Sequence, residues 1–280
     1  MTTARRAACI IGWPAKHSRS PKLHGYWIKR YRIAGDYRVE EKSSEAFAAF
    51  VGSLAANGYV GANITIPHKD AALALSEPDD RARAVGAANT LWLDNGTLRS
   101  TNTDVEGFLK ALDAAAPGWD ERTTSAVVLG AGGAGRAVVY GLVERGIKAI
   151  HVVNRTIEKA GHFRERFGDS VHPADWTALP RLLEGSKLLV NTTSLGMHGQ
   201  PELAIDLSTL AADAVVSDIV YVPLKTPLLI AAEQRGLITS NGLDMLLHQA
   251  VRGFELWFGV RPEVTRELFD LLAADIAAST

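Results

Sequence analysis

The stretch Ser-Ala-Val-Val-Leu-Gly-Ala-Gly-Gly-Ala-Gly, residues 125–135, decides the fold of this chain. Its apolar part, residues 125–129, predicts a short buried strand, and a Gly-x-Gly-x-x-Gly motif follows directly. A helix is expected from there to about Arg145, with Gly146 ending it, and residues 149–153 predict a second strand. A strand, a glycine turn, a helix and a second parallel strand make up the unit that binds dinucleotides.

Each glycine of the motif has a physical reason to be there. Gly130 permits the tight turn, Gly132 lets the backbone approach a pyrophosphate, and Gly135 lets the helix pack closely on the sheet. The N-terminus of the helix offers unpaired N–H groups and partial positive charge to the phosphates. A glycine-rich turn without a ligand and the glycine loop of a methyltransferase are the alternative interpretations.

The end of the second strand favours NADP as the cofactor. In a protein that binds NAD, an acidic residue at this place holds the ribose 2′-hydroxyl. This sequence instead has Asn154, Arg155 and Thr156 there, with Lys159 a turn later. The planar guanidinium of Arg155 suits a 2′-phosphate. The missing acid also argues against a methyltransferase that grips ribose.

The composition is that of a globular protein with room for two domains. The chain has 280 residues, of which 47% are hydrophobic and 22% charged. Its net charge of -1 argues against nucleic acid or an anionic membrane as a partner. The apolar run after Arg5 and Arg6 is too short for a signal peptide, and no stretch approaches membrane-spanning length. The lone Cys9, in a predicted buried strand, fits a reducing compartment, so we expect a cytoplasmic protein.

Strand-like and helix-like segments alternate along the chain, which predicts an α/β architecture. One helix is expected to begin with Ser20 as its N-cap and Pro21 in its first turn. The sequence Asp-Asn-Gly at 94–96 predicts a hairpin. The other predicted strands are 7–11, 59–66, 188–190 and 215–220, and the other helices are 45–56, one from about Asp104, and a long final one from Gly242.

Polar residues gather at or just after the expected carboxyl ends of strands, where open α/β sheets place ligands. Their hydroxyls, an amide and one Lys–Asp pair describe a site for a small, polyhydroxylated, anionic molecule. These residues are Ser18, Ser20, Thr65, Lys69, Asn89 and Asp104.

The segments that carry these residues resemble the shikimate dehydrogenase family over nearly the whole chain. The resemblance rests on motifs that occur here in the family's order. They are Ser18-Arg-Ser20-Pro, Asn63-Ile-Thr65-x-Pro-x-Lys69, Gly86-Ala-x-Asn89-Thr, Asn102-Thr-Asp104, Gly130-Ala-Gly-Gly-Ala134, Asn154-Arg-Thr156, Asn191-Thr-Thr-Ser-x-Gly-Met197, Asp218-Ile-Val-Tyr221, Thr226-Pro-Leu-Leu229 and Gly242-Leu-x-Met-Leu-x-x-Gln249-Ala.

The resemblance implies reversible NADP-dependent reduction of 3-dehydroshikimate to shikimate, a step of aromatic amino-acid biosynthesis. It implies a Rossmann-type doubly wound parallel-sheet domain, residues 105–241, inserted into a smaller α/β substrate domain formed by residues 1–104 and 242–280. Lys69 and Asp104 would be the catalytic pair, in a monomer or homodimer. The substrate would contact Ser18, Ser20, Thr65, Asn89, Asp104, Tyr221 and Gln249, and NADP would contact Gly130, Ala131, Gly132, Gly133, Ala134, Asn154, Arg155, Thr156, Lys159, Ile219 and Gly242.

The sequence departs from the family at a few places. Gly25 stands where Asn is common, Val105-Glu106 replaces a common Gly, and Gly135 stands where Ser or Ala is frequent. None of these changes removes a catalytic group, although the one beside Asp104 bears on the local loop geometry.

Two other functions remain open at this point. One is a related enzyme that prefers quinate or aminoshikimate, and the other is a non-catalytic sensor of such metabolites. Retention of both Lys69 and Asp104 argues against the sensor, since binding alone needs no proton donor.

Overall fold

The computed structural model describes residues 6–279, which form two compact units. Of the described residues, unit 1 comprises 6–103 and 249–272, and unit 2 comprises 104–248 and 273–279. Two helices, α11 (Gly242–Phe258) and α12 (Arg266–Ala277), are each divided between the units. The chain therefore leaves unit 1 after Thr103, returns to it at Gln249 and leaves it again after Leu272.

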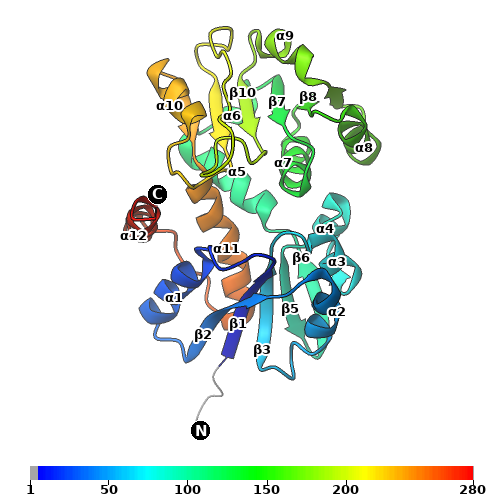
Figure 1. Ribbon diagram of the computed structural model, residues 1–280, viewed down its shortest axis with the longest axis vertical. Helices are drawn as coiled ribbons and strands as arrows, with labels where there is room; N and C mark the ends of the chain where they lie inside the picture. The colour runs from blue at the N-terminus through cyan, green and yellow to red at the C-terminus, as the bar shows by residue number, and fades with distance from the viewer. Residues whose placement is uncertain (1–5, 280) are drawn as a thin grey trace. The chain divides into compact units, whose positions relative to one another are not determined.

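The sheet of unit 1 is mixed, with strand order β2-β1-β3-β5-β6-β4 (Figure 1). Strand β1 pairs in parallel with β2 and β3, whereas β5 runs antiparallel to β3 and to β6. The N-terminal end of β5 therefore lies at the same edge as the carboxyl ends of β1 and β3. The elements are β1 Arg6–Gly12, α1 Ser20–Arg30, β2 Gly35–Glu41, α2 Ser44–Gly52, β3 Tyr59–Ile64, α3 Lys69–Ala74, β4 Glu77–Pro78, α4 Asp80–Val85, β5 Thr90–Asp94 and β6 Thr97–Thr101.

Alternating side chains of β1 and β3 supply a core on each face of this sheet. Cys9 and Ile11 pack into a cluster with Phe47 and Val51 of α2, so the lone cysteine is a core residue. On the other face, the indole of Trp257 in α11 donates to the carbonyl oxygen of Leu91 at 2.8 Å.

A glycine at position 61 makes that second contact possible. A Cβ at Gly61 would overlap the indole of Trp257 and the carbonyl oxygen of Leu91. The indole is 1% exposed, so it has no free space into which it could retreat. The docking of α11 on the sheet therefore depends on the missing side chain.

The sheet of unit 2 is wholly parallel, with strand order β9-β8-β7-β10-β11-β12. Numbered within the unit this is the order 3-2-1-4-5-6 of doubly wound dinucleotide-binding folds, whose ligand binds where the order reverses, here at β7 and β10. The elements are α5 Asp104–Ala115, α6 Trp119–Arg122, β7 Ser125–Leu129, α7 Gly133–Glu144, β8 Ala149–Val153, α8 Ile157–Phe167, β9 Val171–Ala174, the 3₁₀ turn η1 Trp176–Ala178, α9 Leu179–Leu183, β10 Leu188–Asn191, β11 Val215–Asp218, α10 Pro227–Gln234 and β12 Ile238–Ser240.

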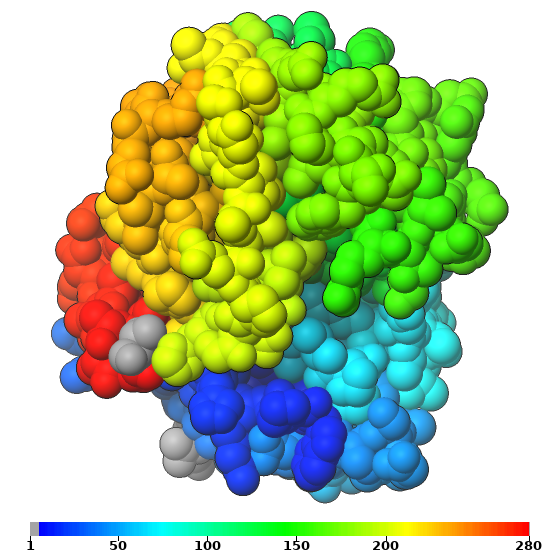
Figure 2. All heavy atoms as spheres, turned by 45° about the horizontal axis from the view of Figure 1, so that its top comes forward, coloured from blue at the N-terminus to red at the C-terminus, as the bar shows by residue number. Residues whose placement is uncertain are grey.

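Both faces of the parallel sheet are covered, as a doubly wound fold requires. Val127, Leu129 and Val216 on one face pack against leucines of α9, of α10 and of the segment around Leu207. Figure 2 shows that yellow segment beside the orange α10 at the surface. On the other face α7 packs against β7, and α5 packs on α7. The predicted α/β class and the Rossmann-type sheet are confirmed.

Several predicted element bounds are wrong for local reasons. Ser20 is the first residue of α1 rather than its N-cap, which is Arg19. Helix α2 ends at Gly52, because the Ser53 hydroxyl donates to the carbonyl oxygens of Ala49 and Phe50. Strands β3 and β11 end two residues early, at Ile64 and Asp218, because the next residues turn into the site described below.

Two further elements, β2 and α12, were not predicted from the sequence. Strand β2 lies at the edge of its sheet and is rich in charge, so it lacks a clear apolar alternation. The helix from Gly242 is not the last one, since α12 follows it. Within residues 6–279, no helix combines the length and apolar character that crossing a membrane requires.

We expect Gly61→Ala to lower the free energy of unfolding by about 1–3 kcal/mol, because the added methyl overpacks the contact with Trp257. Gly52→Ala is the matched control, since a Cβ there meets nothing within 4 Å and the residue lies in a helix. That change should be neutral or stabilise by up to about 1 kcal/mol. Urea denaturation followed by circular dichroism measures both, and equal stabilities would contradict the packing argument.

Candidate active site

In unit 1, the loops that follow β1 and β3 are joined by backbone hydrogen bonds. The amide of Thr65 donates to the carbonyl oxygen of Ile11 at 2.9 Å, and the amide of Trp13 donates to that of Ile66 at 3.0 Å. The Thr65 methyl group occupies the space where a Cβ of Gly12 would lie. The predicted residue Thr65 thus sits directly against the start of the serine loop.

The two serines lie where that loop enters α1. The Ser18 hydroxyl accepts a hydrogen bond from the Ser20 amide at 3.2 Å, which closes a tight turn. Ser20 is buried, and its hydroxyl bonds to that of Tyr37, which in turn donates to Asn63 Oδ1 at 2.6 Å. Burial raises the pKa of the Tyr37 hydroxyl well above its usual value, so Tyr37 remains a neutral donor.

Lys69 is the first residue of α3 and is half-buried. Its carbonyl oxygen accepts from the amide of Ala88 at 3.0 Å, which fixes it beside the loop that carries Asn89. The preceding His68 is buried, with Nε2 2.7 Å from the Lys42 carbonyl oxygen and its ring stacked on Phe47 at 4.3 Å. The backbone that presents Lys69 is therefore held on both sides.

Asn89 organises the polar centre of this edge. Its Oδ1 accepts from the Thr103 amide at 2.8 Å and from the hydroxyls of Thr103 and Thr90 at 3.1 Å each. Its Nδ2 donates to Gln249 Oε1 at 3.4 Å, and the Thr103 hydroxyl, 3.3 Å from the same oxygen, can donate its single hydrogen either there or to Asn89 Oδ1. Asn89 was predicted to lie at or after the carboxyl end of a strand, and this is wrong, because it directly precedes β5. The antiparallel pairing of β5 with β3 brings it to this edge.

Unit 1 therefore brings six of the predicted residues to one edge of its sheet. Asp104 follows Thr103 as the first residue of α5, and the residue is 8% exposed. Asp104 and Tyr221, which lies half-buried after β11, belong to unit 2. The six residues of unit 1 are Ser18, Ser20, Thr65, Lys69, Asn89 and Gln249.

In unit 2, the glycine turn lies at the point where the strand order reverses. Gly130 has a φ of 100°, and a Cβ there would lie 2.9 Å from the Thr193 methyl group. A Cβ on Gly135 would lie 2.6 Å from the Gly130 carbonyl oxygen, so α7 crosses the turn in close contact. A Cβ on Gly132 would meet nothing within 4 Å. The turn thus has backbone N–H groups and open space at the N-terminus of α7, which fits a pyrophosphate.

The end of β8 lies beside this turn. Asn154 Oδ1 accepts from the Ala131 amide at 3.2 Å, and its Nδ2 donates to the Thr156 carbonyl oxygen at 2.8 Å. Thr156 is the N-cap of α8. Arg155 directly precedes this cap, Lys159 lies in the first turn of the helix, and both side chains are exposed. Two cations beside the glycine turn, with no acidic residue between β8 and Thr156, fit a nucleotide that carries a 2′-phosphate.

The carboxyl ends of β10 and β11 hold a second buried polar cluster. Asp218 accepts from Asn191 Nδ2 at 2.9 Å, from the Val220 amide at 3.0 Å and from the Thr226 hydroxyl at 2.7 Å. Burial raises the pKa of Asp218 to about 6, and these three donors oppose that shift. A Cβ on Gly242 would overlap the Ile219 carbonyl oxygen, so these two predicted nicotinamide neighbours are in contact.

Several residues of these clusters have no role in the prediction from sequence. Their signal is a polar residue at or beyond the carboxyl end of a buried strand, the rule that found Thr65. These residues are Asn63, Thr103, Asn191, Asp218 and Thr226.

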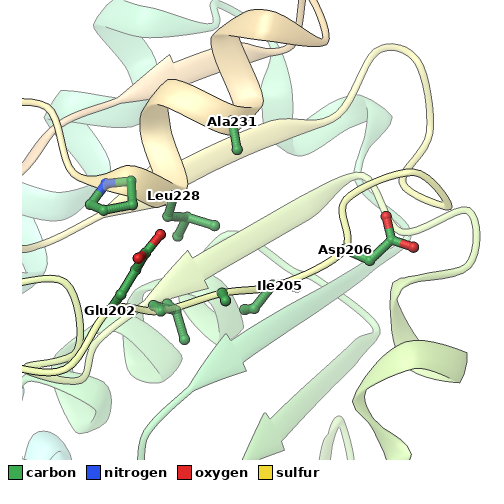
Figure 3. Close-up of a pocket in the computed structure, with 8 residues that line it drawn as sticks. Glu202, Ile205, Asp206, Leu228 and Ala231 are labelled. Atoms are coloured by element: carbon green, nitrogen blue, oxygen red, sulfur yellow. The ribbon is translucent and has the colours of Figure 1, made fainter.

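A separate pocket of about 370 Å³ lies between α10 and residues 202–206 (Figure 3). Leu228 and Ala231 of α10 line it, with Glu202 and Asp206 toward its two ends. None of the predicted site residues lines this pocket. Among residues 6–279, no group of His, Cys, Asp and Glu could hold a metal ion.

Three protein-family models match the chain. The shikimate dehydrogenase substrate binding domain matches residues 10–91, the shikimate/quinate 5-dehydrogenase model matches 115–219, and the shikimate 5′-dehydrogenase C-terminal domain matches 242–266. Among curated proteins, the chain is 63% identical over 277 residues to the shikimate dehydrogenase (NADP(+)) of Rhodopseudomonas palustris, covering 99% of both chains. It is 63% identical over 274 residues to that of Nitrobacter winogradskyi, covering 98% of both.

Solved structures agree with these matches. The fold is similar to quinate dehydrogenase from Corynebacterium glutamicum in complex with NAD, with a TM-score of 0.89, 31% identity, and coverage of 96% of this chain and 99% of that one. It is also similar to shikimate 5-dehydrogenase from Thermus thermophilus in complex with NADP(H) and shikimate, with a TM-score of 0.85, 33% identity, and coverage of 97% and 99%. The chain belongs to the shikimate dehydrogenase family.

Proposed function

We propose that this protein catalyses the reversible NADP-dependent reduction of 3-dehydroshikimate to shikimate, in aromatic amino-acid biosynthesis. The observation that carries the proposal is the hydrogen-bonded cluster of Thr103, Asn89 and Gln249 beside the serine loop and Lys69. Relatives 63% identical over almost their whole length bear the name shikimate dehydrogenase (NADP(+)).

NADPH supplies a hydride when it is bound. The residues of the glycine turn, Gly130 to Ala134, would bind its pyrophosphate through backbone N–H groups at the N-terminus of α7. Arg155 and Lys159 would bind the 2′-phosphate, with Asn154 and Thr156 shaping that corner. Ile219 and Gly242, whose backbones touch, would line the nicotinamide side.

The substrate contacts proposed for unit 1 suit a small polyhydroxylated acid. The Ser18 and Ser20 hydroxyls lie at the N-terminus of α1, where partial positive charge favours a carboxylate. The hydroxyl of Thr65 and the amides of Asn89 and Gln249 would bind ring hydroxyls, as would Asp104 and Tyr221 of unit 2.

Lys69 and Asp104 are proposed as the catalytic pair. When a hydride reaches the ring carbonyl, negative charge builds on its oxygen. A nearby proton donor stabilises that charge and typically raises the rate by about 10²–10⁴-fold. Lys69 Nζ would donate the proton to that oxygen. Asp104 would orient Lys69 and bind a neighbouring hydroxyl of the substrate.

The remaining proposals concern the protein's setting. We propose domains at residues 1–104, 105–241 and 242–280, action in the cytoplasm as a monomer or homodimer, and no nucleic-acid or membrane partner. The buried lone Cys9 supports action in the cytoplasm. The net charge of -1 supports the absence of a nucleic-acid or membrane partner.

An assay with four substrate and cofactor pairs tests the proposed reaction. Shikimate and quinate are each offered with NADP and NAD, and cofactor reduction is followed by absorbance. Quinate and NAD are included because the quinate dehydrogenase of Corynebacterium glutamicum, solved with NAD, has a similar fold. We expect the highest kcat/KM with shikimate and NADP. A preference for quinate or for NAD would overturn that assignment, and no turnover with any pair would favour a sensor.

We expect Lys69→Ala to lower kcat by about 100-fold or more, because it removes a proton donor that acts in the transition state. The KM for shikimate should change little, since the hydroxyls and amides that bind the ring remain. Lys29→Ala, which removes an exposed lysine in the last turn of α1, is the control. Unchanged kcat with a raised KM would make Lys69 a binding residue only.

We expect Arg155→Ala to raise the KM for NADP by about 10- to 100-fold, the range for losing a hydrogen bond to a charged group. The KM for NAD should stay within about twofold, because NAD lacks the 2′-phosphate. Arg164→Ala on α8, the helix that follows Arg155, is the matched control, and this arginine pairs with Asp169 at 3.3 Å. Equal losses for both cofactors in steady-state kinetics would refute the role of Arg155.

A further inference from the structure

The Asp218 carboxylate holds together three segments of unit 2. Its Oδ1 accepts from Asn191 at the end of β10 and from the Val220 amide, two residues along its own chain. Its Oδ2 accepts from the hydroxyl of Thr226, the N-cap of α10, at 2.7 Å. Asp218 is 1% exposed and Thr226 is fully buried. One side chain therefore fixes both ends of the loop formed by residues 219–226.

That loop carries two residues to which the proposed function gives a role. Ile219 begins it and touches Gly242, and Tyr221 follows two residues later. The loop has a second support, in which the His198 amide donates to the Val222 carbonyl oxygen at 2.8 Å. A shift at either end of so short a loop moves both proposed contacts together.

We propose that ionised Asp218 is a positioning residue that sets the loop 219–226, and with it Ile219 and Tyr221, for hydride transfer. This inference rests on the proposed function of the same site. Asp218 itself touches neither substrate nor cofactor in this scheme. It acts through the Val220 amide and the Thr226 hydroxyl.

The bonding pattern fits the charged form of the carboxyl group. All three groups that face Asp218 donate, namely the Asn191 amide, the Val220 N–H and the Thr226 hydroxyl. A protonated Asp218 would bring a fourth hydrogen into this cluster, and the Thr226 hydroxyl would lose its acceptor. Thr226 also caps α10 by accepting from the Leu229 amide at 3.4 Å, so a change there reaches the helix.

The charged groups on the neighbouring elements do not neutralise Asp218. Lys225 on the loop pairs at the surface with Glu233 of α10 at 2.7 Å, and Asp244 at the start of α11 accepts from Asn241. Among the described residues, none of the groups that shift the pKa of Asp218 is a cation. His198, on the segment bonded to Val222, is the titratable side chain nearest in the chain to that second support.

The direction of the pH effect follows from burial. Desolvation raises the pKa of Asp218 to about 6, so the carboxylate is ionised above that pH and gains a proton as the pH falls through it. Activity that depends on the ordered loop should therefore be present above about pH 6 and fall below it.

The test compares kcat/KM for shikimate and NADP from pH 5 to 9 in wild type, Asp218→Asn and His198→Gln. We expect the wild type to lose activity below about pH 6. Asp218→Asn should be at least about tenfold less active at pH 8, with KM raised for both shikimate and NADP and without the acidic fall. His198→Gln should keep the wild-type profile. Since histidines ordinarily titrate between pH 5 and 8, a profile altered by His198→Gln alone would overturn the proposal.

A second pair of variants keeps the proposal testable if Asp218→Asn fails to fold. Thr226→Ser keeps the hydroxyl and Thr226→Val removes it. We expect Thr226→Ser to retain wild-type kcat/KM and Thr226→Val to lose about tenfold with KM raised for both ligands. A protein that is merely less stable would instead lose active molecules at unchanged KM.

The outcomes separate this inference from the proposed function. A wild type that oxidises no shikimate with NADP would overturn the proposed function itself. An active wild type would overturn only the positioning role if Asp218→Asn kept its activity and acidic fall, or if Thr226→Val matched Thr226→Ser.

Discussion

Buried polar groups at the carboxyl edges of the two sheets constrain everything that functions in this protein. A polar group without a hydrogen bond inside a protein costs roughly 2–7 kcal/mol, so each one must find partners. In unit 1, the amide oxygen of Asn89 accepts hydrogen bonds from Thr90 and Thr103, and its amide nitrogen donates one to Gln249. In unit 2, Asp218 collects three donors from three segments. The loops that carry the site residues are thereby fixed by what these two side chains need.

The two clusters differ in their cost to the fold. Asn89 is neutral, and its satisfied amide stabilises the folded chain. Asp218 is charged and buried, and a folded pKa near 6 against an ordinary value of 3.8 corresponds to about 3 kcal/mol of lost stability at pH 7. Because the folded pKa is raised, this loss shrinks as the pH falls through 6. A buried carboxylate that destabilises the fold, at the end of the loop proposed to carry Ile219 and Tyr221 to the site, indicates that loop geometry rather than stability keeps it there.

Close packing supports the same arrangement from behind the sites. Gly61 admits the Trp257 indole against β3, and α11, which carries Gln249, is thereby seated on the sheet of unit 1. Gly135 lets α7 cross the turn at Gly130, so the N-terminus of that helix faces the space where phosphate would bind. In both units, the absence of one methyl group decides where a helix that carries predicted site residues can lie.

The sequence by itself determined the α/β class, the parallel unit around residues 125–153, and the family, because glycine spacing, apolar runs and ordered motifs are local signals. It also predicted Thr65 and Lys69 for the site, of which Thr65 follows the buried strand β3 directly and Lys69 begins the next helix. It misplaced Asn89, because only the antiparallel pairing of β5 turns the start of that strand toward the site. It gave no role to Asp218 or Asn191, whose meaning depends on β10 and β11 lying side by side. Tertiary structure decided these points because hydrogen bonds between residues such as Asn191 and Asp218 leave no periodic trace along the chain.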